Sequence, residues 1–191
     1  MADQLNVLVI CGSLRKGSYN AALTRALPAL APPDMKLVTA PTIGTLPLYN
    51  ADVQDSSGFP GPAEDLAAAI RAADGVLFVT PEYNWSMPGV LKNAIDWLSR
   101  MTPQPFAGKP MAVFGASGGP LGTARSQYHL RQMMVFLDGR MINKPEVMIG
   151  AAQTKFVDGK FTDEVGAKLL TDLGASLALA IRQAKAAATV K

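Results

Sequence analysis

The chain has 191 residues, of which 49% are hydrophobic and 17% are charged. This length and composition are those of a single globular domain with a sizeable core, and they exclude a disordered chain. The net charge of +3 comes without a dense run of Lys or Arg, which argues against nucleic-acid binding and favours anionic ligands such as phosphates.

Strands and helices are predicted in strict alternation. The expected strands are apolar runs without polar alternation, as is typical of strands buried on both faces of a parallel sheet. They cover residues 6–11, 36–40, 75–80, 111–116 and 146–149. The expected helices cover residues 21–30, 63–73, 90–100, 122–136 and about 163–188. In the last helix a residue recurs every fourth position and predicts one buried stripe: Val165, Leu169, Leu173, Leu177 and Ile181.

Five strands alternating with five helices predict one α/β domain over residues 1–191, with a parallel sheet between two helical layers. A flavodoxin-like three-layer sandwich with strand order 2-1-3-4-5 is the natural candidate at this count. Segment 41–62, rich in Pro, Gly, Ser and Asp, interrupts the pattern without convincing periodicity. Two interpretations stay open: Leu46, Leu48 and Tyr49 pack on their own subunit, or they cover a ligand or a neighbouring protomer.

The loop Gly12-Ser-Leu-Arg-Lys-Gly-Ser-Tyr-Asn20 lies between the first apolar run and a helix. The first N–H groups of a helix have no intrahelical partner, and its dipole is positive at that end, so such a loop predicts an anion site. Ser13, Ser18 and Asn20 add side-chain donors, while Arg15 and Lys16 add positive charge. The expected guest is a phosphate.

The glycine pattern of this loop argues against two classes of phosphate ligand, dinucleotides and nucleoside triphosphates. The G-x-G-x-x-G of dinucleotide folds is missing. Gly12 and Gly17 have the spacing of a nucleoside-triphosphate loop, but Ser18 occupies the position of the required lysine. A hydroxyl-rich loop suits a terminal phosphate monoester, and flavin mononucleotide (FMN) fits best among common cofactors. An ordinary polar turn before a well-capped helix is the alternative.

Two further loops have unusual chemistry. After the third strand comes Thr80-Pro-Glu-Tyr-Asn-Trp-Ser-Met-Pro-Gly89, with Ser86 as the expected helix N-cap. Its aromatic and amide side chains suit a flat heteroaromatic ring, the alternative being a structural turn with two exposed aromatics. After the fourth strand comes the small-residue loop 115–122. In the order 2-1-3-4-5 these loops meet the first loop in one crevice, where ligands of open α/β sheets bind.

Three segments together resemble the NADPH-dependent FMN reductase family: GSLRKGSYN, PEYNWSMPGVLKNAIDW and GASGGPLGTARSQYHLRQ. The similarity runs in order from Val7 to about Gly150. It implies a flavodoxin-like fold, bound FMN, NADPH or NADH as electron donor, and hydride transfer to the flavin and then to a second substrate. Quinones are the expected acceptors, with chromate, azo dyes and free flavins as further ones. Family members form dimers or tetramers.

The resemblance also implies a set of cofactor-binding residues. The phosphate and ribityl end would lie at Ser13, Leu14, Arg15, Lys16, Gly17, Ser18, Tyr19 and Asn20. The isoalloxazine would be lined by Pro81, Glu82, Tyr83, Asn84 and Trp85, with Ser117 and Gly118 at its other edge. Main-chain N–H groups of residues 117–119 would be suitable donors to the charge formed on reduction.

No side chain is expected to act as a catalytic acid or base, because the cofactor carries the chemistry. Tyr83 has two readings: it steers or protonates a quinone, or it packs on the ring. The only histidine, His129, is expected on a solvated or interface surface. Arg125 and Tyr128 either face a partner chain, meeting Glu146, or form a solvated helix face. We expect no metal site.

Two rival functions share the FMN site. A flavodoxin-type electron carrier would be strongly acidic, whereas this chain is basic; a redox sensor that binds FMN without turnover is the other rival. The single cysteine, Cys11, excludes an internal disulfide and favours a reducing cytoplasm. We expect neither a signal peptide nor a membrane span, because the apolar runs begin close to Met1 and are short. The residues do not distinguish NADPH from NADH.

Overall fold

The computed structural model describes residues 4–189. Within them, one six-stranded sheet has the order β2-β1-β3-β4-β5, with β6 also paired to β4, and every pairing in it is parallel. The strands are Leu5–Cys11 (β1), Met35–Thr39 (β2), Gly75–Val79 (β3), Pro110–Ala116 (β4), Arg140–Met141 (β5) and Val147–Ile149 (β6). The predicted flavodoxin-like order 2-1-3-4-5 is confirmed.

The fifth position of the sheet is divided between two short strands. β5 pairs with the first residues of β4, at Pro110 and Met111, and β6 pairs with its last three residues. We predicted β6 closely and missed β5. Two residues are too few to produce a periodic signal in the sequence, so pairing with β4 alone defines β5 as a strand.

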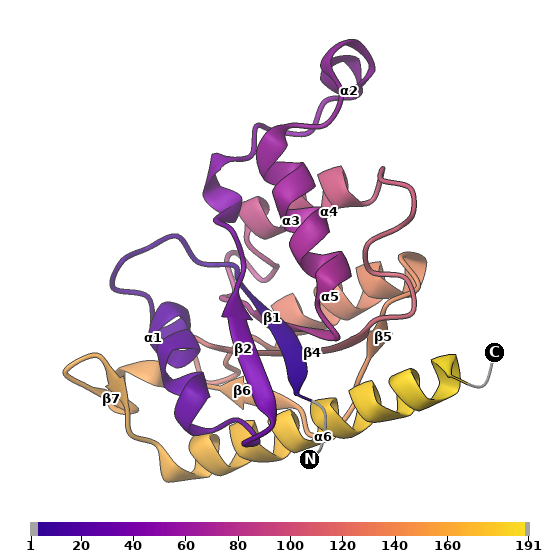
Figure 1. The fold of residues 1–191 in the computed structure, drawn as a ribbon. Helices are drawn as coiled ribbons and strands as arrows, with labels where there is room; N and C mark the ends of the chain where they lie inside the picture. Colours follow the sequence, from indigo (N-terminus) through magenta and orange to yellow (C-terminus); the bar gives the residue numbers. More distant parts are fainter. Residues whose placement is uncertain (1–3, 190–191) are drawn as a thin grey trace.

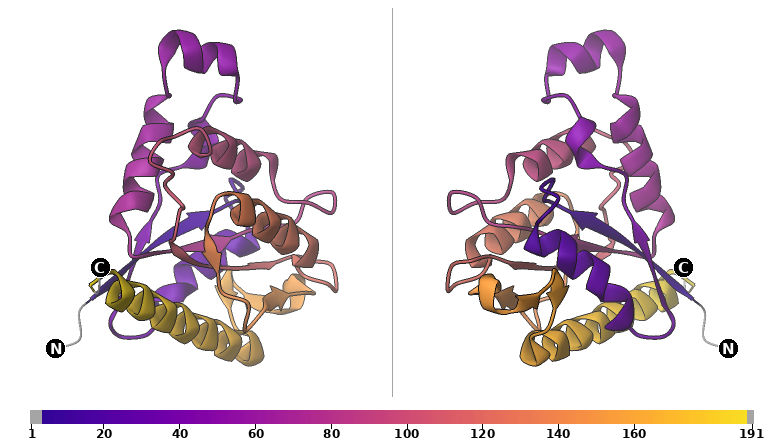
Figure 2. Two further views of the ribbon diagram at one scale, coloured as in Figure 1. Left: turned by 90° about the vertical axis from the view of Figure 1, so that its right-hand side faces the viewer. Right: turned by 90° about the vertical axis from the view of Figure 1, so that its left-hand side faces the viewer.

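Helices cover both faces of the sheet (Figures 1 and 2). The helices α1 (Tyr19–Ala26) and α6 (Glu164–Ala188) share one apolar core with the sheet, and α3 (Gly61–Ala72), α4 (Gly89–Leu98) and α5 (Ala124–Phe136) share the other. The central strands β3 and β4 are buried along their whole length. Their unbroken apolar sequences follow from this burial between two helical layers.

Two helices differ from the prediction in their details. α1 ends at Ala26 and continues as a 3-10 turn, Leu27–Ala29 (η1), because Pro28 lacks the N–H that an α-helix would use. In α6, Val165 is 70% exposed, so its assignment to the buried stripe was wrong. A strict four-residue repeat drifts around a helix of 3.6 residues per turn, and the buried stripe instead includes Leu170.

Segment 41–62 contains regular structure that we did not predict: a 3-10 turn, Ile43–Thr45 (η2), and the helix Ala51–Ser57 (α2), whose first turn is capped by the Asn50 side chain. Tyr49 packs edge-on against Trp97 at 5.0 Å, whereas Leu48 is 83% exposed. Tyr49 therefore packs on its own subunit, whereas the interpretation that Leu48 covers a ligand or a neighbouring protomer stays a prediction. α2 stands away from the body of the molecule beyond α3 (Figures 1 and 2).

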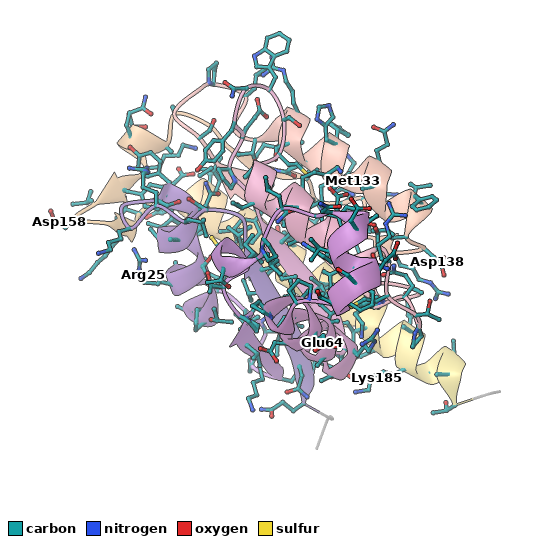
Figure 3. The ribbon with its side chains drawn as sticks, turned by 90° about the horizontal axis from the view of Figure 1, so that it is seen from above. Arg25, Glu64, Met133, Asp138, Asp158 and Lys185 are labelled. Atoms are coloured by element: carbon teal, nitrogen blue, oxygen red, sulfur yellow. The ribbon has the colours of Figure 1, made fainter. Side chains whose placement is uncertain are left out.

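A small hairpin was also missed. Its strands, Phe156–Val157 (β7) and Lys160–Phe161 (β8), follow a 3-10 turn at Ala152–Thr154 (η3) and pack against α1, where the Phe156 ring lies 5.0 Å from that of Tyr19. Seen from above, Asp158 at the hairpin tip and Asp138 after α5 lie on opposite sides of the molecule (Figure 3). Within residues 4–189, no helix combines the length and apolar character needed to cross a membrane.

Candidate functional site

The three unusual loops meet where β1, β3 and β4 end, and together they line one cavity of about 200 Å³. Ten of the fifteen predicted site residues line it: Ser13, Arg15, Ser18, Tyr19, Asn20, Pro81, Glu82, Tyr83, Ser117 and Gly118. Ala116, which we did not predict, lines it as well. The remaining predicted residues lie outside the cavity lining: Leu14, Lys16, Gly17, Asn84 and Trp85.

The first loop presents free donors at the start of α1. Ser18 is the N-cap, and its Oγ accepts from the main-chain N–H groups of Asn20 (3.1 Å) and Ala21 (3.3 Å). Within residues 4–189, the N–H groups of Lys16, Gly17 and Tyr19 donate to no protein acceptor. The positive end of the α1 dipole points the same way, and Arg15 lines the cavity. This is an anion cradle.

Asn20 has a role that sequence reasoning missed. Its Nδ2 donates to the carbonyl oxygen of Ala116, and its Oδ1 accepts from the Ala116 N–H, both at 2.9 Å. Both partners are buried, so the start of α1 is joined to the end of β4 by two hydrogen bonds. We expected the Asn20 side chain to donate to a phosphate. Its Oδ1 and one N–H of Nδ2 are used inside the protein, and because Nδ2 has a second N–H and Asn20 lines the cavity, that role stays a prediction.

The second loop folds as a tight turn. Tyr83 and Ser86 exchange main-chain hydrogen bonds of 2.9 and 3.0 Å around Asn84 and Trp85, which both have positive φ values, 50° and 63°. Two successive left-handed residues characterise the type I′ turn. The N-cap position of α4 is Pro88, so the prediction of Ser86 as N-cap was wrong. Ser86 Oγ instead lies 2.9 Å from Nδ1 of His129, which is exposed as expected.

The start of α5 holds this second loop in place. The Glu82 carboxylate accepts from the main-chain N–H groups of Arg125 (2.9 Å) and Ser126 (3.2 Å), and it pairs with the Arg125 guanidinium at 3.1 Å. Ser126 Oγ donates to the Pro81 carbonyl oxygen and lies 2.9 Å from Thr80 Oγ1. Glu82 therefore caps a helix that follows it by some forty residues, which no local sequence pattern reveals.

The third loop has fewer free donors than we expected. The Ser117 N–H donates to the Ile149 carbonyl oxygen at 3.0 Å, and the Ser117 hydroxyl donates to the Gly122 carbonyl oxygen. Within the described residues, the N–H groups of Gly118 and Gly119 have no protein acceptor. Of the three expected main-chain donors, two are thus free. The start of this third loop lies close to the start of the second loop. A Cβ on Gly115 would lie 2.0 Å from the Thr80 carbonyl oxygen.

Arg125, Tyr128 and Glu146 contact groups of their own chain. Tyr128 donates to Glu146 Oε1 at 2.6 Å, and this hydrogen bond lowers the pKa of Glu146 and raises the pKa of Tyr128. Arg125 pairs with Glu82 of its own chain, and the expected meeting with Glu146 across a partner chain stays a prediction. In the same part of the chain, no cluster of His, Cys, Asp or Glu is suited to a metal ion.

Comparisons with known proteins agree with this architecture. The chain is 56% identical over 155 residues to a quinone reductase of Escherichia coli (strain K12), covering 81% of this chain and 82% of that protein. It is 52% identical over 184 residues to an NAD(P)H-dependent FMN reductase of Pseudomonas aeruginosa, covering 96% and 98%. A flavoenzyme NAD(P)H:(acceptor) oxidoreductase of Paracoccus denitrificans superposes with a TM-score of 0.82 at 37% identity, covering 94% and 98%.

The sheet order and the crevice define a flavodoxin-like α/β protein with an anion cradle beside a glycine-rich loop. The family model of NADPH-dependent FMN reductases matches residues 5–154, which is most of this chain. The protein belongs to that family, and the resemblance read from the three sequence segments is confirmed.

Replacing Asn20 with Ala should destabilise the protein before any ligand is bound. The Ala116 N–H and carbonyl groups would be left buried without partners, at a cost of about 2–4 kcal/mol. For a chain of this size we expect the melting temperature to fall by roughly 5–10 °C in thermal denaturation followed by circular dichroism. Thr24→Ala on the same helix is the control, since it removes only a hydroxyl that donates to the Asn20 carbonyl oxygen. Equal losses in both variants would contradict the assigned role.

Proposed function

We propose that this protein binds FMN in the cavity, reduces it with NADPH or NADH, and passes two electrons to a quinone. The observation that carries the site assignment is the anion cradle at the start of α1, which lies in one cavity with the loops that follow β3 and β4. Quinone reduction is supported by the 56% identity to a quinone reductase. Chromate, azo compounds and free flavin are further candidate acceptors.

The donor groups present suit FMN. A phosphate monoester offers three oxygens, and the cavity lining supplies the free N–H group of Tyr19, the Ser13 hydroxyl and the Arg15 guanidinium to receive them. The walls at residues 81–83 and 116–118 combine a proline, an aromatic ring and small residues, which can lie against a flat ring. The residues of this chain therefore fit the group.

FMN, when bound, accepts hydride from the nicotinamide and returns two electrons to the acceptor. The protein then has three tasks. Arg15 and the α1 N-terminus bind and orient the phosphate. The free N–H groups of Gly118 and Gly119 are the remaining donors for negative charge at the ring edge. Tyr83 lines the cavity and is 47% exposed, so its ring or hydroxyl is accessible to a quinone.

The visible spectrum of the purified protein tests this function. We expect a yellow protein, or a colourless one that takes up FMN, whose absorbance bleaches under anaerobic conditions when NADPH or NADH is added. A quinone should restore the colour over many turnovers, and the rates with each nucleotide give the donor preference. A protein that never takes up FMN would refute the proposal. FMN binding without turnover would favour the electron carrier or the redox sensor.

Arg15→Ala tests the position of the phosphate. Losing a charge-assisted contact should weaken FMN binding roughly 10- to 100-fold, because such contacts contribute about 1.5–3 kcal/mol. Riboflavin, which lacks the phosphate, should bind both proteins equally in a fluorescence titration. Arg25→Ala is the matched control, since Arg25 is exposed in the last turn of α1 and does not line the cavity. If Arg15→Ala weakened the binding of riboflavin and FMN equally, the phosphate would not bind at Arg15.

We also propose that the protein is a cytoplasmic homodimer or homotetramer. The exposed face of α5 supports the assembly: Val135 and Phe136 are 80% and 86% exposed, and Tyr128 lies two turns before them. Exposed apolar side chains grouped on one helix face are typical of interaction surfaces. The Tyr128–Glu146 pair lies beside this face, whereas the charge of Arg125 is paired with Glu82. The absence of an internal disulfide agrees with the cytoplasm.

Replacing both Val135 and Phe136 with Ser should lower the mass measured by sedimentation velocity to that of a smaller assembly, because it removes apolar area from the α5 face. Substitution of Leu179, an exposed residue of α6 on the other side of the sheet, is the control. An unchanged mass in the double variant would exclude this face as the interface. Tyr128→Phe, which removes only the hydroxyl, shows whether the pair with Glu146 contributes.

A further inference from the structure

The turn at residues 83–86 has a conformation that its own sequence does not favour. Asn adopts positive φ with moderate ease, but a bulky residue such as Trp85 does so rarely. Trp85 is also 69% exposed, so burial in the core does not compensate for the strain. Such a conformation persists only where surrounding contacts favour it over the alternatives.

Ser86 contacts His129, and Arg125 supplies the contacts made by Trp85 itself and by Glu82 before the turn. Its guanidinium carbon lies 3.9 Å from the centroid of the Trp85 ring, and its Nη1 lies 3.1 Å from Glu82 Oε1. The planar guanidinium therefore stacks on the residue at the tip of the turn while it pairs with the residue that precedes the turn. Arg can do both because its flat face and its edge are available to different partners.

We propose that Arg125 is a positioning residue that holds the 83–86 turn in its ligand-ready conformation, and so sets the wall of the cavity formed by Glu82 and Tyr83. This inference rests on the proposed FMN site, because that wall is assigned to the flavin ring. Arg125 itself does not line the cavity. Its effect is therefore exerted through the turn, by increasing the fraction of molecules whose wall is already in place.

Binding of FMN to the apoprotein measures this fraction. If removing the stack leaves about a tenth of the molecules with the turn in place, the dissociation constant for FMN rises about tenfold. Arg125→Met should show this rise. Arg125→Lys, which keeps the charge but loses the planar face, should bind FMN nearly as weakly. Lys92→Met is the charge-matched control, since Lys92 is on the neighbouring α4, is half exposed and, among residues 4–189, pairs only with Asp96; it should bind like the natural protein.

The indole of Trp85 gives a readout that needs no flavin. The other tryptophan, Trp97, is fully buried, so the near-ultraviolet circular dichroism that Trp85→Phe removes belongs to the turn. We expect Arg125→Met to remove the same signal, because the stacked ring becomes mobile. The variant should still fold, since Glu82 caps α5 through main-chain N–H groups that the substitution keeps. Arg125→Gln is the second variant if Arg125→Met is insoluble.

Each outcome then has one meaning. Weak binding by Arg125→Met and Arg125→Lys, with the Trp85 signal lost and sedimentation unchanged, supports the inference. Full binding by Arg125→Met, or rescue by Arg125→Lys, overturns it. So does a loss of mass in Arg125→Met, because the effect would then pass through subunit assembly. If the natural protein binds no FMN, the proposed function fails, and the Trp85 signal alone decides whether Arg125 orders the turn.

Discussion

The cap that Glu82 places on α5 determines what the rest of the crevice can bind. The N-termini of α1 and α5 both point toward this edge of the sheet, and each would attract an anion. At α5, the Glu82 carboxylate accepts hydrogen bonds from two main-chain N–H groups and pairs with Arg125. The positive end of the α5 dipole is therefore compensated by a group of the same chain. At α1, the cap is an uncharged hydroxyl, and further N–H groups stay free. This difference supports the proposal that the phosphate binds at α1 and the ring near α5.

The same edge is held together by pairs that join elements distant in sequence. Asn20 joins α1 to β4, and Ser126 joins α5 to the loop after β3. Each of these buried polar groups has its partner on another element, so α1 cannot move away from β4, nor α5 from the loop after β3, without leaving a buried group unsatisfied. The cavity is thus preorganised by its own polar network. A flavin site gains from this arrangement, because elements that are already joined need less ordering on binding.

The sequence predicted that the three loops meet in one crevice, because the strand order alone determines that meeting. Apolar runs show where parallel strands end, and the order 2-1-3-4-5 brings three such ends together. Sequence reasoning failed where a contact joins distant residues. Nothing local shows that Asn20 bonds to Ala116, or that the N–H and the hydroxyl of Ser117 bond to Ile149 and Gly122. The short elements α2, β5, β7 and β8 were missed for a related reason: they are too short for a periodic signal.

Trp85 shows how a local sequence feature depends on a contact between distant residues. As a sequence feature, an exposed aromatic beside an FMN-like loop suggests a ring-binding wall, yet the structure places this indole outside the cavity and against Arg125. Its left-handed backbone turns the chain so that Tyr83 and Ser86 can pair, and Tyr83 then faces the cavity. The bulky residue at the tip is tolerated because the guanidinium anchored by Glu82 gives it a partner. The carboxylate that neutralises α5 therefore also shapes the wall of the site, through one arginine.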